Sequence, residues 1–239
     1  NKMPNDWRWI GGEYSATETL DNGLPDLFGE LPFPWEEPLA AGVDEAGRGA
    51  LAGPVCVAAV ILDPSTPIEG LNDSKKLTVA ERERLAIEIR EKATAWAVAW
   101  GSVEEIDEHN ILQATMIALK RAVNDLSVKP TTVMIDGNYR PKGLPYPACT
   151  LVKGDARVAQ IAAASILAKT SRDHLMTEME GNYPGYHFAK HAGYGTAVHL
   201  EALKVLGPSA IHRKTFDPVK TMLANGTTPR DTASLETKE

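Results

Sequence analysis

Long apolar segments are missing from this sequence of 239 residues. The longest nearly uninterrupted apolar stretch runs from Leu51 to Leu62 and already contains Gly53 and Pro54. A membrane-spanning helix needs about 20 apolar residues, so we expect no membrane-embedded protein. No basic segment leads into an apolar one near the N-terminus, and we therefore expect a cytoplasmic protein without a secretory signal.

Cysteine is also scarce. Cys56 and Cys149 are the only two, and each lies inside an apolar run that is typical of a strand. This placement predicts buried thiols, whereas a disulfide framework or a zinc site needs more cysteines at closer spacing.

A net positive charge, which often marks a nucleic-acid-binding protein, is absent too, because the formal net charge is −7. The acidity is concentrated in the tails, since residues 1–40 alone carry eight acidic and two basic residues. Residues 140–220 instead contain 11 Lys and Arg against six Asp and Glu. Two interpretations stay open for that region: a basic face for a polyanion, and a solvated surface of mixed charge.

The pattern of apolar residues predicts a mixed α/β fold. Apolar runs bounded by glycine and proline predict five strands, at 39–43, 54–62, 96–100, 131–135 and 148–152. Apolar residues at helical spacing predict long helices at 79–93, 110–126 and 156–179 and a further helix at 196–206. The first of these helices begins with a capping box, Thr78 to Glu81. The order of the elements predicts a central five-stranded mixed sheet flanked by helices.

Three regions follow from the same pattern. Residues 1–38 are acidic, contain several prolines and aromatic residues and show no sustained period, which predicts an N-terminal extension. Residues 39–220 form the main domain, with a small helical C-terminal region from about residue 182. Residues 221–239 are a C-terminal tail.

Acidic residues stand at the ends of three predicted strands. Asp44 and Glu45 follow the first strand, Asp136 follows the fourth, and Asp155 lies just beyond the fifth. Ligand sites in open α/β sheets lie outside the carboxyl ends of strands, so these side chains meet if their strands are neighbours. Four carboxylates suit Mg²⁺ or Mn²⁺. The alternatives are a solvated turn at Asp44 and Glu45 and a helix N-cap at Asp155.

Ordered short motifs over residues 39–220 resemble those of bacterial type 2 ribonuclease H, the ribonuclease HII family. They are Gly42–Gly49, Leu51–Val55, Asp73–Leu77, Ile135–Gly137, Lys153–Asp155, Ala162–Lys169, Arg172–Asp173 and His212–Phe216.

The resemblance implies a ribonuclease H-like fold and an endoribonuclease that acts on RNA–DNA hybrids and on ribonucleotides embedded in duplex DNA. Such an enzyme incises 5′ to the ribonucleotide with two divalent ions and leaves a 3′-hydroxyl and a 5′-phosphate. By this resemblance Asp44, Glu45, Asp136 and Asp155 are the catalytic and metal-binding acids, and the protein is a monomer. The rival interpretations are a non-catalytic hybrid-binding protein and a different nuclease on the same fold, such as a junction resolvase.

The resemblance also assigns residues that read the substrate. Gly47, Arg48 and Gly49 match the loop whose backbone senses the ribose 2′-hydroxyl, and Tyr194 matches the tyrosine that stacks on the neighbouring sugar. This sequence departs from the family pattern at Gly195, where proline is more common, which leaves the placement of Tyr194 less constrained.

Several other polar residues have weaker assignments. Lys75 and Lys76 precede a helix and suit phosphate contacts, with a solvated loop as the alternative. Lys169 and Asp173, on the long helix, are expected to support the acids without binding metal themselves. His187 and His191 lie four residues apart, but the loop residues before them favour solvated or substrate-lining histidines over a zinc site.

The extension contains one candidate contact motif. Its Leu27 and Phe28 resemble the short peptides with which bacterial repair enzymes hold the sliding clamp, although the leading glutamine is absent. The alternative is that this pair packs on the main domain or belongs to a disordered tail.

Overall fold

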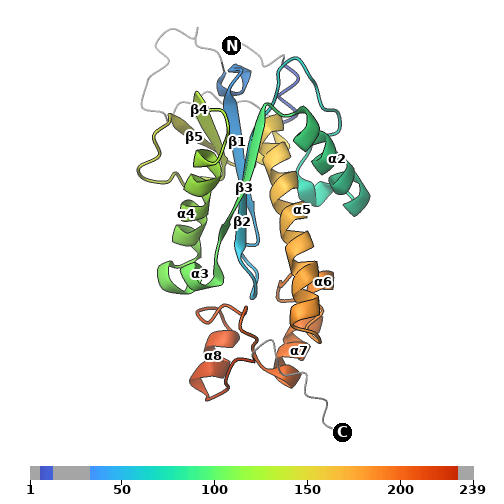
Figure 1. The fold of residues 1–239 in the computed structure, drawn as a ribbon, viewed down its shortest axis with the longest axis vertical. Coiled ribbons are helices and arrows are strands. Elements are labelled where there is room, and N and C mark those ends of the chain that lie inside the picture. The colour runs from blue at the N-terminus through green and yellow to red at the C-terminus, as the bar shows by residue number, and fades with distance from the viewer. Residues whose placement is uncertain (1–5, 13–32, 231–239) are drawn as a thin grey trace. The chain divides into compact units, whose positions relative to one another are not determined.

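The computed structural model describes residues 6–12 and 33–230 of the chain. A five-stranded mixed sheet is flanked by helices, as the sequence predicts (Figure 1). Its strands are β1 (Ala40–Ala46), β2 (Val55–Ile61), β3 (Ala95–Gly101), β4 (Thr132–Asp136) and β5 (Ala148–Leu151), arranged in the order β3-β2-β1-β4-β5.

The middle of the sheet aligns the strand ends that carry the acids. β1 and β4 pair in parallel with Val43 opposite Ile135, and β4 pairs in parallel with β5. Asp44 and Asp136 are the next residues along their strands, so they lie opposite each other near the carboxyl ends of neighbouring strands. This confirms the condition under which the sequence predicts that the two carboxylates meet.

Seven α-helices lie in the described residues: α2 (Val79–Lys92), α3 (Val103–His109), α4 (Ile111–Asn124), α5 (Ala159–Asn182), α6 (Phe188–His191), α7 (Ala197–Leu206) and α8 (Val219–Ala224). Three 3₁₀ turns accompany them: η1 (Pro34–Glu36), η2 (Ser74–Lys76) and η3 (Gly154–Ala156). The capping box of Thr78 and Glu81 is present at the start of α2. None of the helices in the described segments is long and apolar enough to cross a membrane.

The chain divides into two compact units. Unit 1 comprises residues 1–46, 57–99 and 116–170, and unit 2 comprises residues 47–56, 100–115 and 171–239. Helix α5 includes residues of both units, and the predicted helical region from about residue 182 lies within unit 2.

Side chains of unit 1 alternate between two apolar clusters on opposite faces of the sheet. Val43, Val133 and Ile135 contribute to the cluster that contains α4 residues, and Met134 contributes to the cluster with Val158 of the segment before α5. This alternation follows from the two-residue period of a strand. Asp44 and Asp136, one or two residues further along, therefore belong to the α5 face.

Helix α5 approaches β1 at Gly42. A Cβ atom on this glycine would lie 2.2 Å from the backbone carbon of Gln160. The backbones of β1 and α5 are therefore in contact two residues before Asp44. This contact fixes the position of the following residues of β1 relative to α5.

Parts of the predicted extension belong to unit 1. Trp35 is fully buried and lies in the same core cluster as Met134 and Leu151. The sequence pattern predicts an extension over residues 1–38, because the aromatic residues there follow no helix or strand period. In the structure, Phe33 and Trp35 instead belong to the core cluster that contains Met134 and Leu151, and Trp9 packs against this cluster.

Candidate catalytic site

Three of the predicted acids form a carboxylate cluster in unit 1. Asp44 at the end of β1, Asp136 at the end of β4 and Asp155 in η3 each offer an oxygen, and these atoms lie within 4.8 Å of one another. Asp44 is only 5% exposed, whereas the other two are half-buried. We call Asp44, Asp136 and Asp155 the carboxylate cluster.

The turn between β5 and α5 brings Asp155 to the strand ends. Lys153 adopts the left-handed conformation with φ 55°, and η3 follows it. The Asp155 backbone N–H then donates to Oδ1 of Asp136 at 3.3 Å. A Cβ atom on Gly154 would lie 2.6 Å from Cδ1 of Ile161, so this turn packs closely against α5.

The cluster favours protons or cations over free negative charge. Burial raises the pKa of Asp44 well above its ordinary value, and the neighbouring carboxylates, Asp136 first, raise this pKa further. Burial and the charge of Asp136 raise the pKa of Asp155 to about 7. The Asp136 pKa is raised by burial, an effect opposed by backbone hydrogen bonds from Asp155 and Gly154.

An all-oxygen donor set of this kind fits a hard divalent cation. Carboxylate oxygens are the ligands that Mg²⁺ and Mn²⁺ prefer, and a cation removes the repulsion that raises the pKa of Asp44. The described residues therefore fit the metal expected from the sequence.

Glu45 lies outside the carboxylate cluster. Alternation along β1 places it on the face of Val43, opposite to the face of Asp44. Its charge still raises the pKa of Asp44. The sequence alone does not separate Glu45 from the other acids, because it does not show that the strand continues past Asp44 to Ala46.

Asp73 is an acid of this site that the sequence analysis did not single out. Its side chain shares a hydrogen bond with Asp155, and its charge raises the pKa of both Asp155 and Asp136. Asp73 also caps η2 by accepting from the backbone N–H of Lys75 at 3.0 Å. The Asp73–Leu77 motif carries the signal, since an acid two residues before paired lysines is a turn cap next to a cationic surface.

The lysines of η2 lie beside the carboxylate cluster. Lys75 and Lys76 are exposed, and the charge of Lys75 lowers the pKa of Asp155. Ser74 between Asp73 and Lys75 is buried and accepts from Oγ of Ser165 on α5 at 2.9 Å. This contact holds η2 against α5. Lys169 lies half-buried further along that helix, still within unit 1.

The predicted substrate-reading residues meet in unit 2. The Gly47 N–H donates to Oη of Tyr194 at 3.1 Å, while Arg48 and Gly49 are exposed beside it. Tyr194 is fixed on both sides despite Gly195, because its N–H donates to His191 O and its carbonyl accepts from the Thr196 N–H.

Two buried arginines shape this loop. Arg213 is fully buried and donates to the carbonyls of Gly47, Arg48 and Gly53. Arg172, also buried, donates to the carbonyls of Ala52, Pro54 and Ala192. Gly47 has φ 92°, and a Cβ atom on it would lie 2.0 Å from Nε of Arg172. All three guanidinium nitrogens of Arg213 therefore bond to carbonyls of this loop.

Asp173 and the histidines of unit 2 take structural positions. Asp173 is half-buried on α5, and its carbonyl accepts from Oγ1 of Thr177. His191 is buried with Nε2 2.6 Å from the Tyr186 carbonyl, so it is neither solvated nor substrate-lining. His187 is exposed at the start of α6 in a left-handed conformation.

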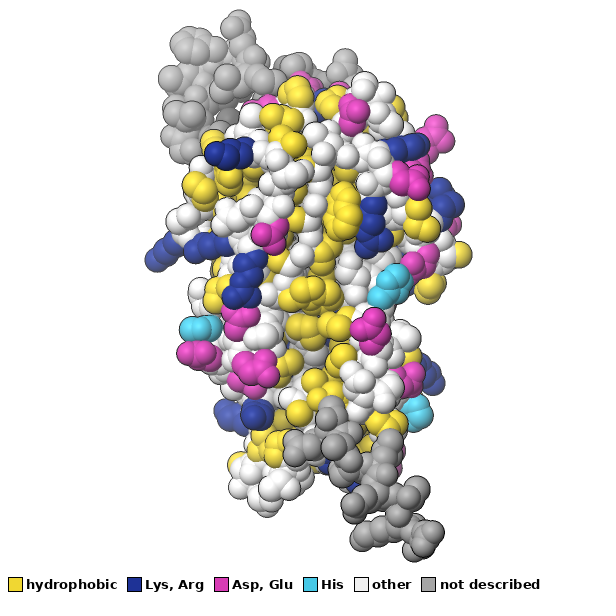
Figure 2. Space-filling model, viewed as in Figure 1, with side chains coloured by type: hydrophobic (Ala, Val, Ile, Leu, Met, Phe, Trp, Pro, Cys, Tyr) yellow, Lys and Arg dark blue, Asp and Glu magenta, His cyan; other side chains and the backbone are white. Residues whose placement is uncertain are grey.

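Surface charge gives no sign-segregated face in the view of Figure 2. Lys and Arg side chains are interspersed there with Asp and Glu among the described residues (Figure 2).

Comparisons with known proteins agree on one family. The family model described as ribonuclease HII matches residues 41–219. A ribonuclease HII of Laribacter hongkongensis is 59% identical over 186 residues, which are 77% of this chain and 94% of the relative.

Solved structures agree as well. The ribonuclease H2 of Pyrococcus horikoshii has a TM-score of 0.66 at 28% identity and covers 78% of this chain and 97% of its own. The structure of a PCNA:ribonuclease HII complex from Archaeoglobus fulgidus has a TM-score of 0.63 at 26% identity. The match covers 74% of this chain and 95% of the other chain.

Proposed function

Because the chain belongs to the ribonuclease HII family, and is thus an endoribonuclease of RNA–DNA hybrids, we propose that its carboxylate cluster holds two divalent cations for phosphodiester hydrolysis. We further propose that it incises 5′ to ribonucleotides embedded in duplex DNA. The observation that carries the proposal is the meeting of Asp44, Asp136 and Asp155 within 4.8 Å in a partly buried setting.

The acids and the lysine of this site have different roles in the proposed reaction. Asp44, the most buried of the three acids, would hold a cation together with Asp136 and Asp155, and the charge of the adjacent Glu45 adds to the negative potential at Asp44. Divalent cations held by these carboxylates would supply charge stabilisation at the scissile phosphate and a lowered pKa for the attacking water. Lys75, exposed on η2, offers a positive charge to a phosphate of the substrate.

Recognition of the 2′-hydroxyl belongs to the loop of Gly47, Arg48 and Gly49 with Tyr194. Arg213 fixes the loop carbonyls, so the direction of the loop's backbone N–H groups is set before substrate binds. Tyr194 Oη marks the point to which one of these N–H groups is directed. This loop begins directly after Ala46, the last residue of β1, so the chain links it to Asp44.

The other expectations from the sequence remain proposals. They are a monomer, a cytoplasmic location and a sliding-clamp contact through the N-terminal segment. The archaeal relative solved in complex with PCNA supports the idea of a clamp contact. Leu27 and Phe28 lie outside the described residues.

The test is cleavage of three duplexes of one sequence: a hybrid, a DNA duplex with one embedded ribonucleotide, and all-DNA. With Mg²⁺ or Mn²⁺ we expect incision of the first two, with 3′-hydroxyl and 5′-phosphate ends at the 5′ side of the ribonucleotide, and no incision with EDTA. A cyclic-phosphate end, activity in EDTA, or preferred cutting of an all-DNA four-way junction would contradict the proposal.

A further inference from the structure

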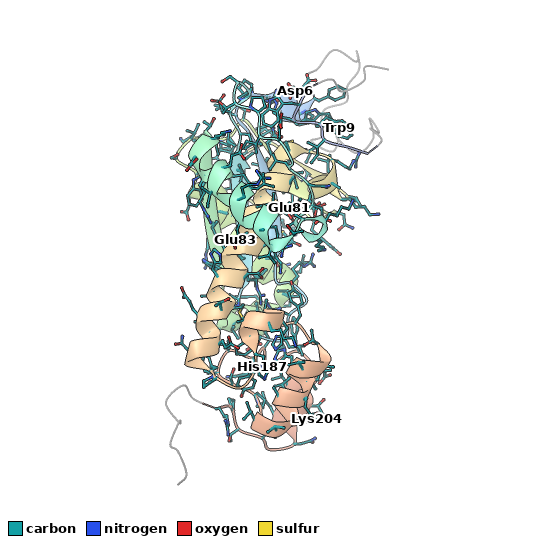
Figure 3. All side chains as sticks on the ribbon, turned by 90° about the vertical axis from the view of Figure 1, so that its right-hand side faces the viewer. Asp6, Trp9, Glu81, Glu83, His187 and Lys204 are labelled. Atoms are coloured by element: carbon teal, nitrogen blue, oxygen red, sulfur yellow. The ribbon has the colours of Figure 1, made fainter. Side chains whose placement is uncertain are left out.

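A short N-terminal segment, residues 6–12, packs against the turn that carries Asp155. Asp6 and Trp9 lie close together in this segment (Figure 3), and Trp9 forms an antiparallel bridge with Val158. The segment lies outside residues 41–219, the part of the chain that the family model matches. We call residues 6–12 the N-terminal brace.

Backbone hydrogen bonds join the brace to the turn on both sides of Val158. The Ile10 N–H donates to the Arg157 carbonyl at 2.8 Å, and the Arg8 carbonyl accepts from the N–H of Ala159 at 2.7 Å. Ala159 is the first residue of α5. The brace therefore supplies an acceptor for one of the N–H groups that a helix start leaves without an intrahelical partner.

Side chains fix the brace to the core of unit 1. The Trp9 ring lies 4.7 Å from that of Trp35, which in turn stacks on Phe33 at 4.7 Å. The Arg157 guanidinium lies 5.3 Å from the centre of the Trp9 ring. Trp9 is thus held between the sheet cluster and a residue of the turn itself.

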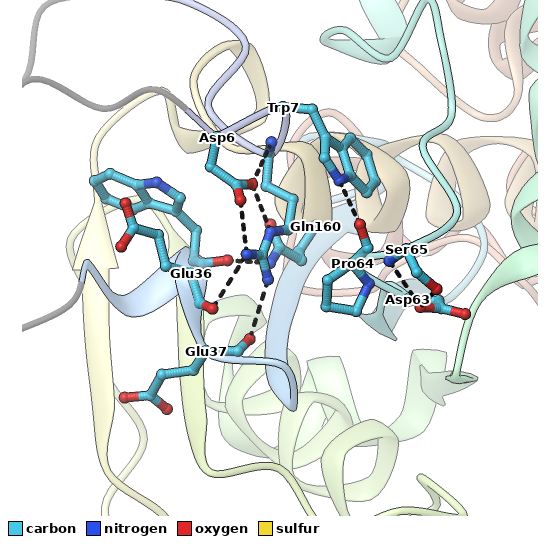
Figure 4. Close-up of polar contacts among 10 residues, drawn as sticks. Asp6, Trp7, Glu36, Glu37, Asp63, Pro64, Ser65 and Gln160 are labelled. Carbon is cyan, nitrogen blue, oxygen red and sulfur yellow. Dashed lines mark hydrogen bonds and ion pairs between the residues drawn. The ribbon is translucent and has the colours of Figure 1, made fainter.

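Arg8 provides further contacts between the brace and the rest of unit 1. It is 3% exposed and pairs with Asp6 at 2.6 Å, and it donates to the carbonyls of Glu36 and Glu37 (Figure 4). The Trp7 indole N–H donates to the Pro64 carbonyl at 2.9 Å (Figure 4). A partly buried ion pair whose Arg8 donors are all bonded gives the brace one fixed position.

The turn transmits this position to the carboxylate cluster. The N–H groups of Arg157 and Val158 both donate to the Gly154 carbonyl, and the neighbouring Asp155 N–H donates to Asp136. Asp155 is therefore set between two supports, Asp136 on the strand side and the brace beyond Arg157. A Cβ atom on Gly11 would lie 3.0 Å from the Ala156 carbonyl, so the brace also follows the turn closely at its far end.

We propose that Trp9 and Arg8 are positioning residues for the metal site: the brace holds Asp155 in the geometry in which it binds a divalent cation. This inference rests on the proposed function, because it takes the carboxylate cluster as the metal site. It predicts that loosening the brace weakens metal binding in a protein that is still folded.

The test measures Mn²⁺ affinity by calorimetry on the full-length protein, at a temperature where circular dichroism shows each variant folded. For Trp9→Ala we expect a dissociation constant for Mn²⁺ raised about 3- to 10-fold, and a matching rise in the Mn²⁺ concentration that half-activates cleavage. Trp9→Phe keeps an aromatic ring against Trp35 and should restore the affinity to within about 2-fold of wild type. Trp96→Ala removes an exposed tryptophan of β3 and serves as the control without effect.

A second variant protects the test against loss of folding. Ile10→Pro removes the N–H that bonds to Arg157 and leaves Trp9 in place, and it should weaken Mn²⁺ binding in the same direction. Wild-type Mn²⁺ affinity in both Trp9→Ala and Ile10→Pro, with only thermal stability reduced, would overturn the inference. Absence of Mn²⁺ binding by the wild-type protein would instead overturn the proposed function.

Discussion

At the scale of single residues, the acids of the carboxylate cluster lie where their ionised forms are unfavourable in the folded chain. Asp44 is buried among other carboxylates, which raises its pKa, so its ionised form is unfavourable in the folded chain. Function explains such a position, because a site that repels its own charges gains most from a cation. The same reasoning predicts opposite effects of one substitution on stability and on activity.

Asp44→Asn should raise the melting temperature of the metal-free protein at pH 7.5 and reduce cleavage at least about 100-fold. The amide keeps the shape of the side chain and removes the buried charge, and a gain of 1 kcal/mol corresponds to about 2–4 °C for a protein of this size. Calorimetry in EDTA and a cleavage assay in Mg²⁺ measure the two effects. A lower melting temperature would show that the Asp44 carboxyl stabilises the fold.

Tyr194→Ala should reduce incision at a single embedded ribonucleotide more than cleavage of a long hybrid. In a hybrid many positions offer a ribose to the loop, whereas a single ribonucleotide offers one, so the loss of the Gly47 to Tyr194 contact weighs more there. Rates on the two substrates under the same conditions give the ratio. An equal loss on both would make Tyr194 a general packing residue of unit 2.

At the scale of elements, the close approach of β1 and α5 sets the depth of the site. Gly42→Ala should destabilise the protein by roughly 1–3 kcal/mol, because its Cβ atom would lie 2.2 Å from the backbone of Gln160. Gly181→Ala, in α5, is the control substitution, since no atom lies within 4 Å of the Cβ position at Gly181. That control should gain up to about 1 kcal/mol from helix propensity. Denaturant unfolding compares them, and equal stabilities would contradict the packing described for Gly42.

The elements also show how far the sequence leads. Apolar runs bounded by glycine and proline predict all five strands to within a few residues. The ends of these strands in turn predict that Asp44, Asp136 and Asp155 lie close together, as they do in the structure. The seven-residue helix α3 was not predicted, although its capping box of Ser102 and Glu105 has the same form as the one that marks α2. A short helix adds too few apolar positions for periodicity to show.

Other features have no local signal in the sequence. A fully buried arginine such as Arg213 cannot be told from an exposed one by its neighbours, because its partners are carbonyls about 160 residues away in the chain. The role of Asp73 and the position of the N-terminal brace likewise depend on contacts that form only on folding.

At the scale of the whole molecule, a histidine cluster makes stability depend on pH. His199 and His212 are fully buried with their Nε2 atoms 2.8 Å apart, and His191 stacks on His199 at 4.4 Å. Burial lowers the pKa of His199 to about 4 and that of His212 to about 3. Their neutral forms are therefore favoured in the folded state.

The sign of the effect follows from proton binding. Below pH 6.5 the unfolded chain protonates these histidines while the folded chain does not, so stability falls as pH decreases from 6.5 towards 4. Relative to His199→Gln, the wild type should lose about 1–2 kcal/mol more of its unfolding free energy between pH 7 and pH 5. Urea unfolding across this range measures the difference, in which the contribution of the carboxylate cluster cancels. Parallel curves would contradict the burial of a neutral His199.

The most direct test of the account is a calorimetric titration of Mn²⁺ into the full-length wild-type protein and into the Asp44→Asn variant. The account predicts saturable binding by the wild type and an affinity at least about 10-fold weaker in Asp44→Asn, because the most buried ligand of the carboxylate cluster has lost its charge. Equal Mn²⁺ binding by the two proteins would show that the metal lies elsewhere, and the account of the catalytic site would be wrong.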